Sequence, residues 1–307
     1  MIAGKILVTG ASGTIGRALL NRLNSTGESM SSSKPTQFGV AVAPHWRLGQ
    51  PLGGALDRVE SLVHLAARVH IRGKGFSDNS GFIKDNADGA LALAQEASFY
   101  GVKRFVFLSS IGVLGSNSST PLTESAPYKA HNAYTTAKAL AEEKLMDFAN
   151  SSDMELVILR SPAVLGPGVK GNVASLVGAV KRGIPLPFSR VLNQRQFVAV
   201  EDLVSAIDLA LSHEGAPGEI FHVANPERVS TRDLCKSVAS CIGVKPKLWP
   251  IPPGVLRSVS TLVGRKSLGD GLTGDLLISS EKITRLLGWQ PRQSLDSALS
   301  DAIRSMS

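Results

Sequence analysis

The chain has 307 residues, of which 43% are hydrophobic and 19% are charged, and its formal net charge at pH 7 is +8. This length accommodates one large α/β unit and a smaller lobe with a substantial core. The basic residues are scattered, and the longest groupings, such as Lys103-Arg104 and Lys181-Arg182, are only pairs. We therefore expect no nucleic-acid partner. An anionic small-molecule substrate accounts for the charge at least as well.

The sequence shows no signal peptide and no membrane-spanning run. Its N-terminus leads straight into an apolar stretch and a glycine turn, and no apolar run is long enough to cross a bilayer. We expect a cytoplasmic protein with no transmembrane segment. Cys235 and Cys241 lie on an expected helix and point to different sides, which disfavours a disulfide or a metal site.

Short apolar runs alternate with helical patterns over the first two-thirds of the chain. This alternation predicts an α/β fold with a parallel sheet covered by helices on both faces. The serine-rich segment 24–37 interrupts it and is expected to be a surface loop. The expected strands are Lys5–Val8, Phe38–Ala43, Ser61–Leu65, Arg104–Leu108 and Glu155–Leu159, and the expected helices are 14–23, 82–100 and 133–148.

After Arg160 proline and glycine become frequent. We expect residues 1–161 to form a dinucleotide-binding unit and residues 162–307 to form mainly a smaller substrate lobe. The chain returns to the larger unit near 191–212, because the stretch from Val198 to Leu211 is typical of a short strand that leads into a helix.

The first predicted strand leads directly into the glycine-rich turn TGASGTIG, which opens the first predicted helix. Gly10 permits a tight turn, Gly13 lets the backbone approach a pyrophosphate, and Gly16 lets helix and strand pack closely. Phosphate is attracted here by unpaired N–H groups and by the positive end of the helix dipole. This context favours a dinucleotide site over a plain β–α turn, with contacts from Gly10, Ser12, Gly13, Thr14, Ile15 and Gly16.

Tyr134 and Lys138 are four residues apart on an expected helix and therefore share one face. A phenol with a pKa of about 10 is a poor base near neutral pH. A nearby ammonium and an oxidised nicotinamide ring both lower that pKa, so that Tyr134 can exchange a proton with a substrate hydroxyl or carbonyl. Ser109 and Ser110 follow a predicted strand at the sheet edge where α/β proteins bind ligands, and a hydroxyl there can hold the same substrate oxygen.

The order and spacing of these motifs resemble one enzyme superfamily. The G-x-x-G-x-x-G turn, HLAA at 64–67, FLSS at 107–110 and YxxxK at 134–138 resemble the extended short-chain dehydrogenase/reductase (SDR) superfamily and its NAD-dependent epimerase/dehydratase family. The resemblance runs as far as the closing LGWQP. HLAARVH, FVFLSS and LGPGVKGN are most similar to UDP-4-keto-6-deoxy-sugar reductases of O-antigen synthesis, which are close relatives of UDP-hexose 4-epimerases.

This resemblance implies a Rossmann-type, doubly wound sheet and a catalytic triad of Ser110, Tyr134 and Lys138, with Ser109 as the second candidate serine. It also implies a homodimer formed through the helices around 86–99 and 134–148, although packing on the sheet explains their apolar faces equally well. The implied cofactor contacts are Leu65, Ala66, Ala67, Asn86, Tyr134 and Lys138, and the implied substrate contacts are Ser110, Tyr134, Asn172 and Arg195.

Two of these contacts concern a diphosphate. The resemblance places Asn172 and Arg195 on the phosphates of the substrate, and a planar guanidinium suits that ligand, whereas a solvent-exposed loop arginine is the alternative for Arg195. The late arginine of the family is matched only by a candidate, Arg265. Asp202 is expected to cap the helix that follows it, and Asn86 is equally well explained as a helix-surface amide.

The end of the second predicted strand bears on the choice of cofactor. NAD enzymes usually place an acid there for the ribose 2′-hydroxyl, whereas an arginine suits the 2′-phosphate of NADP. The strand runs into Pro44-His45-Trp46-Arg47 with no acid near. His45 and Arg47 therefore favour NADP(H) slightly over NAD(H), with Arg47 as a cofactor contact.

Three functions follow from the sequence. The first is reduction of the 4-keto group of a UDP-4-keto-6-deoxy-N-acetylhexosamine in surface-polysaccharide synthesis. The second is a UDP-hexose or UDP-N-acetylhexosamine 4-epimerase with retained NAD. The third is a non-catalytic dinucleotide-binding protein on the same fold, which the presence of Ser110, Tyr134 and Lys138 together disfavours.

Overall fold

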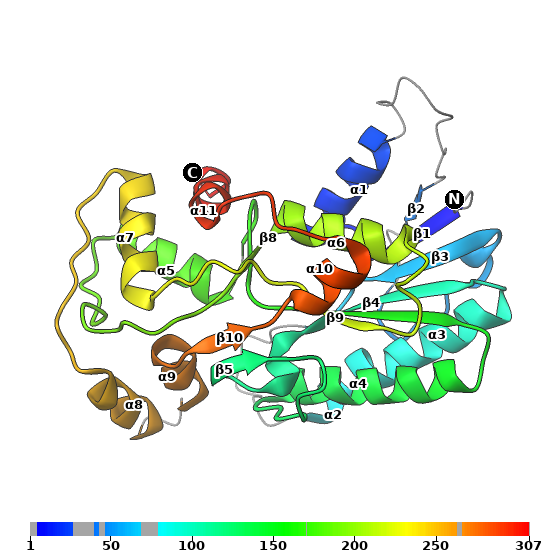
Figure 1. Cartoon of the computed structure of the whole chain (residues 1–307), viewed down its shortest axis with the longest axis horizontal. Helices are drawn as coiled ribbons and strands as arrows, with labels where there is room; N and C mark the ends of the chain where they lie inside the picture. The colour runs from blue at the N-terminus through cyan, green and yellow to red at the C-terminus, as the bar shows by residue number, and fades with distance from the viewer. Residues whose placement is uncertain are drawn as a thin grey trace.

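A computed structural model describes residues 5–26, 40–42, 47–68, 79–169, 171–262 and 266–306. Six strands form one parallel sheet in the order β2-β1-β3-β4-β6-β9, with helices on both faces (Figure 1). The α/β, Rossmann-type fold class is thereby confirmed. The strands of this sheet are β1 (Lys5–Thr9), β2 (Val40–Val42), β3 (Val59–His64), β4 (Arg104–Ser110), β6 (Glu155–Ser161) and β9 (Ile220–His222).

Alternating strand residues divide the core into two clusters. Ile6 and Val8 pack on one face of the sheet with α1 (Thr14–Thr26) and α6 (Val200–Ser212). Leu7 packs on the other face with α3 (Gly89–Phe99) and α4 (Ala133–Asn150). Because successive side chains of a strand point to opposite faces, one apolar run serves both helical layers.

The helix expected over 82–100 has a different form. It consists of α2 (Asn79–Ile83), the π-helical turn η2 (Lys84–Asp88) and α3. Asn86 lies buried in η2, where its Oδ1 accepts from the Arg68 N–H at 2.8 Å and its Nδ2 donates to the Arg68 carbonyl at 3.0 Å. Asn86 is therefore not a helix-surface amide, and it ties this helix to the segment that follows β3. Turns of this kind occur mostly near functional sites.

The elements after β6 build a further core. Val177, Phe197 and Val238 are among the buried side chains that pack together there. Two small parallel pairs join distant segments, β7 with β8 and β10 with β5. The remaining elements are η1 (Gly53–Leu56), η3 (Ile111–Leu114), β5 (Ser118–Leu122), β7 (Val164–Leu165), α5 (Gly171–Lys181), β8 (Val198–Ala199), α7 (Thr231–Ile242), α8 (Pro253–Leu262), α9 (Lys266–Thr273), β10 (Leu276–Ile278), α10 (Glu281–Leu287) and α11 (Leu295–Arg304).

The chain returns to the large sheet twice. The strand-to-helix pattern near Val198 is confirmed as β8 and α6, and α6 packs beside α1. A second return, β9, pairs with β6 at the sheet edge. The division at residue 161 stays a prediction. Cys235 is buried and Cys241 is exposed on α7, and both are free. In the described part of the chain, no helix has the length and apolarity that crossing a membrane requires.

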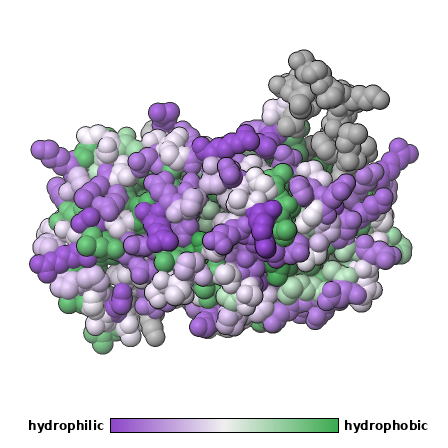
Figure 2. All heavy atoms as spheres, viewed as in Figure 1, coloured by the Kyte–Doolittle hydropathy of each residue, from purple (hydrophilic) through white to green (hydrophobic). Residues whose placement is uncertain are grey.

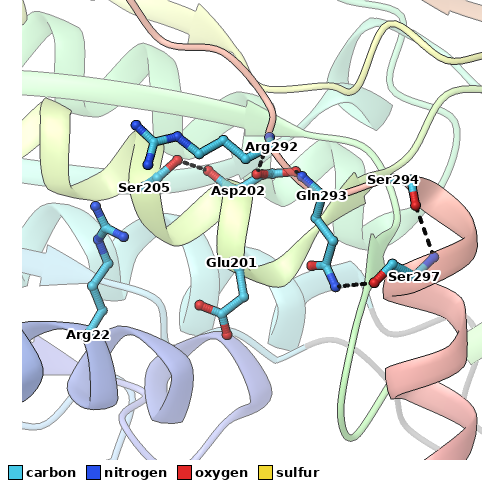
Figure 3. Close-up of a pocket in the computed structure, with 8 residues that line it drawn as sticks. All are labelled: Arg22, Glu201, Asp202, Ser205, Arg292, Gln293, Ser294 and Ser297. Atoms are coloured by element: carbon cyan, nitrogen blue, oxygen red, sulfur yellow. Dashed lines mark hydrogen bonds between the residues drawn. The ribbon is translucent and has the colours of Figure 1, made fainter.

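The expectation that Asp202 caps a helix is wrong. Its carboxylate makes no capping bond to α6 but accepts from the backbone N–H groups of Arg292 at 2.8 Å and Gln293 at 3.3 Å. Trp289 donates its indole N–H to the Asp202 carbonyl at 3.1 Å. These contacts border a cavity of about 510 Å³ between α1, α6 and α11 (Figure 3). Asp202 thus anchors the closing LGWQP segment on α6.

Candidate active site

The glycine turn after β1 brings three backbone segments into close contact. Gly10 has φ +74°, and a Cβ on it would lie 2.6 Å from the backbone nitrogen of Ala66. A Cβ on Gly16 would overlap the Gly10 carbonyl and lie 2.6 Å from the Cα of Ala11. A Cβ on Gly13 would lie 3.2 Å from its nearest neighbour, the Gly10 carbonyl oxygen. Gly10 and Gly16 therefore allow the turn to form.

The HLAA strand end lies against that turn. The backbone N–H of Leu65 donates to the Thr9 carbonyl at 3.2 Å, which holds Leu65 and Ala66 beside Gly10. His64 is buried, and its Nδ1 lies 2.7 Å from the Thr9 hydroxyl. Burial and the nearby Lys138 charge lower the pKa of His64 to about 3. The imidazole is therefore neutral at physiological pH, as suits a structural role beneath the turn.

The start of α1 is also joined to the segment after β7. Thr14 donates its hydroxyl to the Gly168 carbonyl at 2.9 Å, and Gly168 has φ +76°. Of the other turn residues, Ser12 is exposed and Ile15 is half-buried. The LGPG stretch therefore approaches the helix terminus where we expect the phosphates.

Ser109 and Ser110 are the last two residues of β4, not the residues that follow it. Ser109 is buried and donates its hydroxyl to Glu142. Ser110 is half-buried, and its Oγ accepts from the Gly112 N–H at 3.1 Å at the start of η3. A Cβ on Gly112 would meet both Ser110 Oγ and Thr135. Ser110 Oγ and Thr135 of α4 thus both border Gly112, whereas the Ser109 hydroxyl is bonded to Glu142.

Tyr134 and Lys138 occupy the first two turns of α4. Asn132 caps this helix, because its Oδ1 accepts from the Thr135 N–H at 2.9 Å. Burial raises the pKa of Tyr134 to about 12. The lowering of the Tyr134 pKa that we expected from the neighbouring Lys138 is therefore not observed. Lys138 instead donates to the Leu108 carbonyl at 2.8 Å, with its Nζ 4.1 Å from the centre of the Phe107 ring.

Burial also acts on the lysine. It lowers the pKa of Lys138 to about 7, and the negative charge of Glu142 acts in the opposite direction. The Lys138 nitrogen thus lies against an electron-rich ring and a carbonyl oxygen. Its protonation changes near neutral pH, within the range where catalytic groups are usually tuned.

Sequence reasoning missed the charged group beneath these residues. Glu142 lies one turn beyond Lys138 on α4 and forms a buried salt bridge of 2.6 Å with Arg160 of β6. Tyr128 donates to the same carboxylate at 2.8 Å. The available signal was the continued four-residue spacing from Tyr134 through Lys138 to Glu142, with a lone arginine at the end of an apolar strand.

The substrate-side residues lie on separate elements. Asn172 is exposed in the first turn of α5. Arg195 is half-buried and donates to the carbonyls of Gly274 at 3.0 Å and Ser116 at 3.4 Å. Burial lowers the pKa of Arg195 to about 10, against the opposing charge of Asp275. Its guanidinium is thus held beside Ser116, in the short segment between η3 and β5.

The remaining residues expected at the cofactor and substrate are Ala67, Arg47, His45 and Arg265. Ala67 is half-buried beside Ala66. Arg47 is exposed, and its carbonyl accepts from the Gln50 N–H at 3.0 Å. His45 and Arg265 lie outside the described residues, so their proposed roles stay sequence-based.

Residues 6–224 match the NAD dependent epimerase/dehydratase family. The chain belongs to that family. It is therefore an NAD(P)-dependent enzyme of the SDR type. A UDP-glucose 4-epimerase of Vibrio cholerae is 34% identical to this family member over 244 residues, which cover 78% of this chain and 74% of the relative. A UDP-glucose 4-epimerase of Mycolicibacterium smegmatis is 26% identical over 97% of both chains.

A solved structure agrees along almost the whole length. The UDP-glucose 4-epimerase of Thermotoga maritima, determined with UDP-glucose, superposes with a TM-score of 0.76 at 25% identity and covers 98% of both chains. This agreement supports a nucleotide-sugar enzyme of the epimerase/dehydratase family.

The residues present fit the nicotinamide dinucleotide of this family. Gly10 and Gly16 stand where a Cβ would collide with the turn, and a Cβ on Gly13 would lie only 3.2 Å from the Gly10 carbonyl oxygen. A dinucleotide pyrophosphate suits the N-terminus of α1. Tyr134 and Lys138 lie on α4, which packs on the opposite face of the sheet from α1.

Proposed function

We propose that this family member acts at C4 of a UDP-linked hexose or N-acetylhexosamine, as a 4-epimerase that retains NAD. Two named relatives, those of Vibrio cholerae and Mycolicibacterium smegmatis, support this choice, since both are UDP-glucose 4-epimerases. The structural observation that supports the proposal is that Tyr134 and Lys138 lie one helical turn apart on α4, while Ser110 Oγ and Thr135 of the same helix both border Gly112.

The proposed chemistry assigns one task to each side chain. Ser110 Oγ holds the substrate O4 by a hydrogen bond. Tyr134 exchanges the O4 proton, as general base when C4 is oxidised and as general acid when it is reduced. The bound nicotinamide dinucleotide supplies hydride acceptance and return. Lys138 places a positive charge below Tyr134 and holds the nicotinamide ribose.

The neighbouring backbone and diphosphate contacts complete the assignment. Leu65, Ala66 and Ala67 flank the adenosine side of the dinucleotide, and buried Asn86 fixes the segment that follows them. Arg195 and Asn172 hold the substrate diphosphate. A guanidinium already oriented by two carbonyls loses little freedom on binding a phosphate.

A second candidate is reduction of a UDP-4-keto-6-deoxy-N-acetylhexosamine with NADPH, the first of our expectations from sequence. Two observations favour it. Tyr134 has a raised pKa and is a protonated phenol at pH 7, which suits delivery of a proton to a keto oxygen. Arg47 is exposed after the second strand, where the 2′-phosphate of NADP would lie.

One experiment separates the two candidates. The enzyme is incubated with UDP-glucose or UDP-N-acetylglucosamine, and formation of the 4-epimer is followed by proton NMR. In parallel, NADPH absorbance is followed with UDP-4-keto-6-deoxy-N-acetylglucosamine. Epimer formation without net cofactor consumption supports the epimerase, and stoichiometric NADPH loss supports the reductase.

The controls test the catalytic assignment itself. We expect Tyr134→Phe to abolish either activity. A Tyr134→Phe variant as active as the unaltered enzyme would instead support a non-catalytic dinucleotide-binding protein. Light scattering tests the expected homodimer, and cell fractionation tests the expected cytoplasmic location. A role in surface-polysaccharide synthesis belongs to the same proposal, because such pathways consume epimerised and reduced nucleotide sugars.

A further inference from the structure

Helix α8 turns an apolar stripe toward solvent. Val255, Val259 and Leu262 follow the spacing of one helix face and are 51%, 52% and 85% exposed. No residue of α8 is buried. An amphipathic helix of a water-soluble protein normally directs such a stripe to the core. In α8 the apolar stripe points outward.

Contacts on the opposite face hold α8 in this orientation. Gly269 of α9 lies directly against Ser260, where a Cβ would have no room. Arg257 donates to the Thr273 hydroxyl at 2.9 Å and to the Thr273 carbonyl at 3.2 Å. Arg257 and Ser260 therefore join α8 to α9, and Leu256 is half-buried, while Val255, Val259 and Leu262 stay exposed.

The apolar surface continues into the segment before α8. Trp249 is 59% exposed, and Val244 and Ile184 are also exposed. Backbone bonds from Leu186 N–H to the Lys247 carbonyl and from Trp249 N–H to the Leu186 carbonyl, both 2.8 Å, hold the two segments side by side. Hydrophobic side chains show at the lower left of Figure 2, where Figure 1 places α8.

Positive charge surrounds this surface. Lys245 and Lys247 are exposed between α7 and α8, and Lys181 and Arg182 are exposed at the end of α5. Residues 156–200 and 234–269 together contain twelve lysines and arginines and not one aspartate or glutamate. Since the whole chain has a net charge of +8, the rest of it is net negative. Of these twelve, Arg160 is buried against Glu142 and Lys236 pairs with Asp233, so the exposed positive charge of these segments includes Lys181, Arg182, Lys245 and Lys247.

We propose that this surface docks on an anionic lipid bilayer. The α8 surface consists of Trp249, Val255, Val259 and Leu262, with Lys245 and Lys247 in the segment that leads to them. Aliphatic side chains of an interfacial helix enter the headgroup boundary, tryptophan is enriched there, and each nearby lysine gains attraction to anionic lipid. Apolar residues alone would fit many partners, and the exposed Lys245 and Lys247 beside them favour an anionic one.

The α8 surface is connected through the chain to the proposed substrate site. The α8–α9 pair ends at Thr273, and the next residue, Gly274, accepts the hydrogen bond from Arg195. Thr273 is itself fixed to α8 through Arg257. The membrane-facing helix and the arginine assigned to the substrate diphosphate are thus joined by a short, hydrogen-bonded run of chain.

The test uses the full-length protein and vesicles of phosphatidylcholine, with or without phosphatidylglycerol. We expect co-sedimentation with the anionic vesicles and little with the neutral ones. Val259→Asp should weaken binding by about tenfold or more, from the lost apolar burial. Lys245→Gln with Lys247→Gln should weaken it by about thirtyfold. Trp249 fluorescence should be quenched by lipids brominated on their acyl chains.

Matched controls define the outcomes that overturn the proposal. Phe99→Ser removes a side chain that is 86% exposed at the other end of the molecule, and Lys84→Gln with Lys103→Gln removes two other exposed charges. Both should bind like the unaltered protein. Equal losses in control and test variants, or no sedimentation with anionic vesicles, refute lipid docking. A change from dimer to monomer on Val259→Asp without vesicles assigns the α8 surface to a second copy.

Discussion

Arg160 Nη2 lies 2.6 Å from Glu142 Oε2 in a salt bridge whose side chains are only 2% and 0% exposed. This pair joins the end of β6 to the helix that carries Tyr134 and Lys138. Ser109 and Tyr128 complete the hydrogen bonding of the carboxylate. The bridge therefore fixes α4 against the strand ends at the place where the proposed chemistry occurs.

We expect Arg160→Met to lower the free energy of unfolding by about 3–5 kcal/mol, because it leaves Glu142 charged and buried without its main partner. Urea denaturation with circular dichroism measures the loss. As a control, Lys282→Met breaks the more exposed pair with Glu219 and should cost less than about 1 kcal/mol. Equal losses would contradict the special role of the buried pair.

Tyr134→Phe should lower kcat by about 10²–10⁴ through loss of the proton-transfer group. Dinucleotide binding should be nearly unchanged, since the aromatic ring is retained. Steady-state kinetics with the confirmed substrate measures the first effect, and titration calorimetry with the dinucleotide measures the second. A variant that loses binding and activity in proportion would show that the hydroxyl acts in binding alone.

Gly16→Ala should weaken dinucleotide binding and lower stability by about 1–3 kcal/mol, because its Cβ overlaps the backbone at Gly10 and Ala11. Gly254→Ala is the matched control, since no atom lies within 4 Å of the added Cβ. Thermal unfolding with and without dinucleotide separates the effects on stability and binding. If both variants behave alike, the close packing of the turn has no energetic consequence.

Acid should destabilise the fold through buried histidines. Burial and the Arg160 charge lower the pKa of His222 to about 3, and burial and the Lys138 charge do the same for His64. Between pH 6.5 and 3 the unfolded chain binds more protons, so the stabilisation present above pH 6.5 is lost as the pH falls. Each histidine contributes a slope of up to about 1.4 kcal/mol per pH unit.

Urea denaturation across that pH range measures the slope. His222→Gln should reduce the slope by the contribution of one group, with the His64 contribution retained. An unchanged pH dependence in this variant would contradict the assignment of His222 as a buried, neutral imidazole.

Much of the fold could be predicted from local pattern. The run from Lys5 to Gly16 combines an apolar strand, a glycine turn and a helix start, and each signal lies within a few residues of the next. The same holds for Tyr134 and Lys138, whose four-residue spacing places them on one helix face. These predictions needed no knowledge of distant contacts.

Features that depend on distant partners were not predictable in this way. Asp202 follows a short strand and resembles a helix cap, but its carboxylate binds backbone at Arg292 and Gln293, far along the chain. The π-helical turn at Asn86 depends on its bonds to Arg68. Similarly, the pKa of Tyr134 rises because burial outweighs the nearby lysine, whose ammonium is turned to Leu108 and Phe107.

The pairing of β5 with β10 has a consequence for synthesis on the ribosome. β5 follows shortly after η3, but its partner strand β10 begins about 150 residues later. The edge of β5 therefore stays unpaired while the intervening residues are synthesised, when an open strand can associate with other chains. The neighbourhood of Ser110 is completed late, and premature termination before β10 yields a polypeptide with that edge exposed.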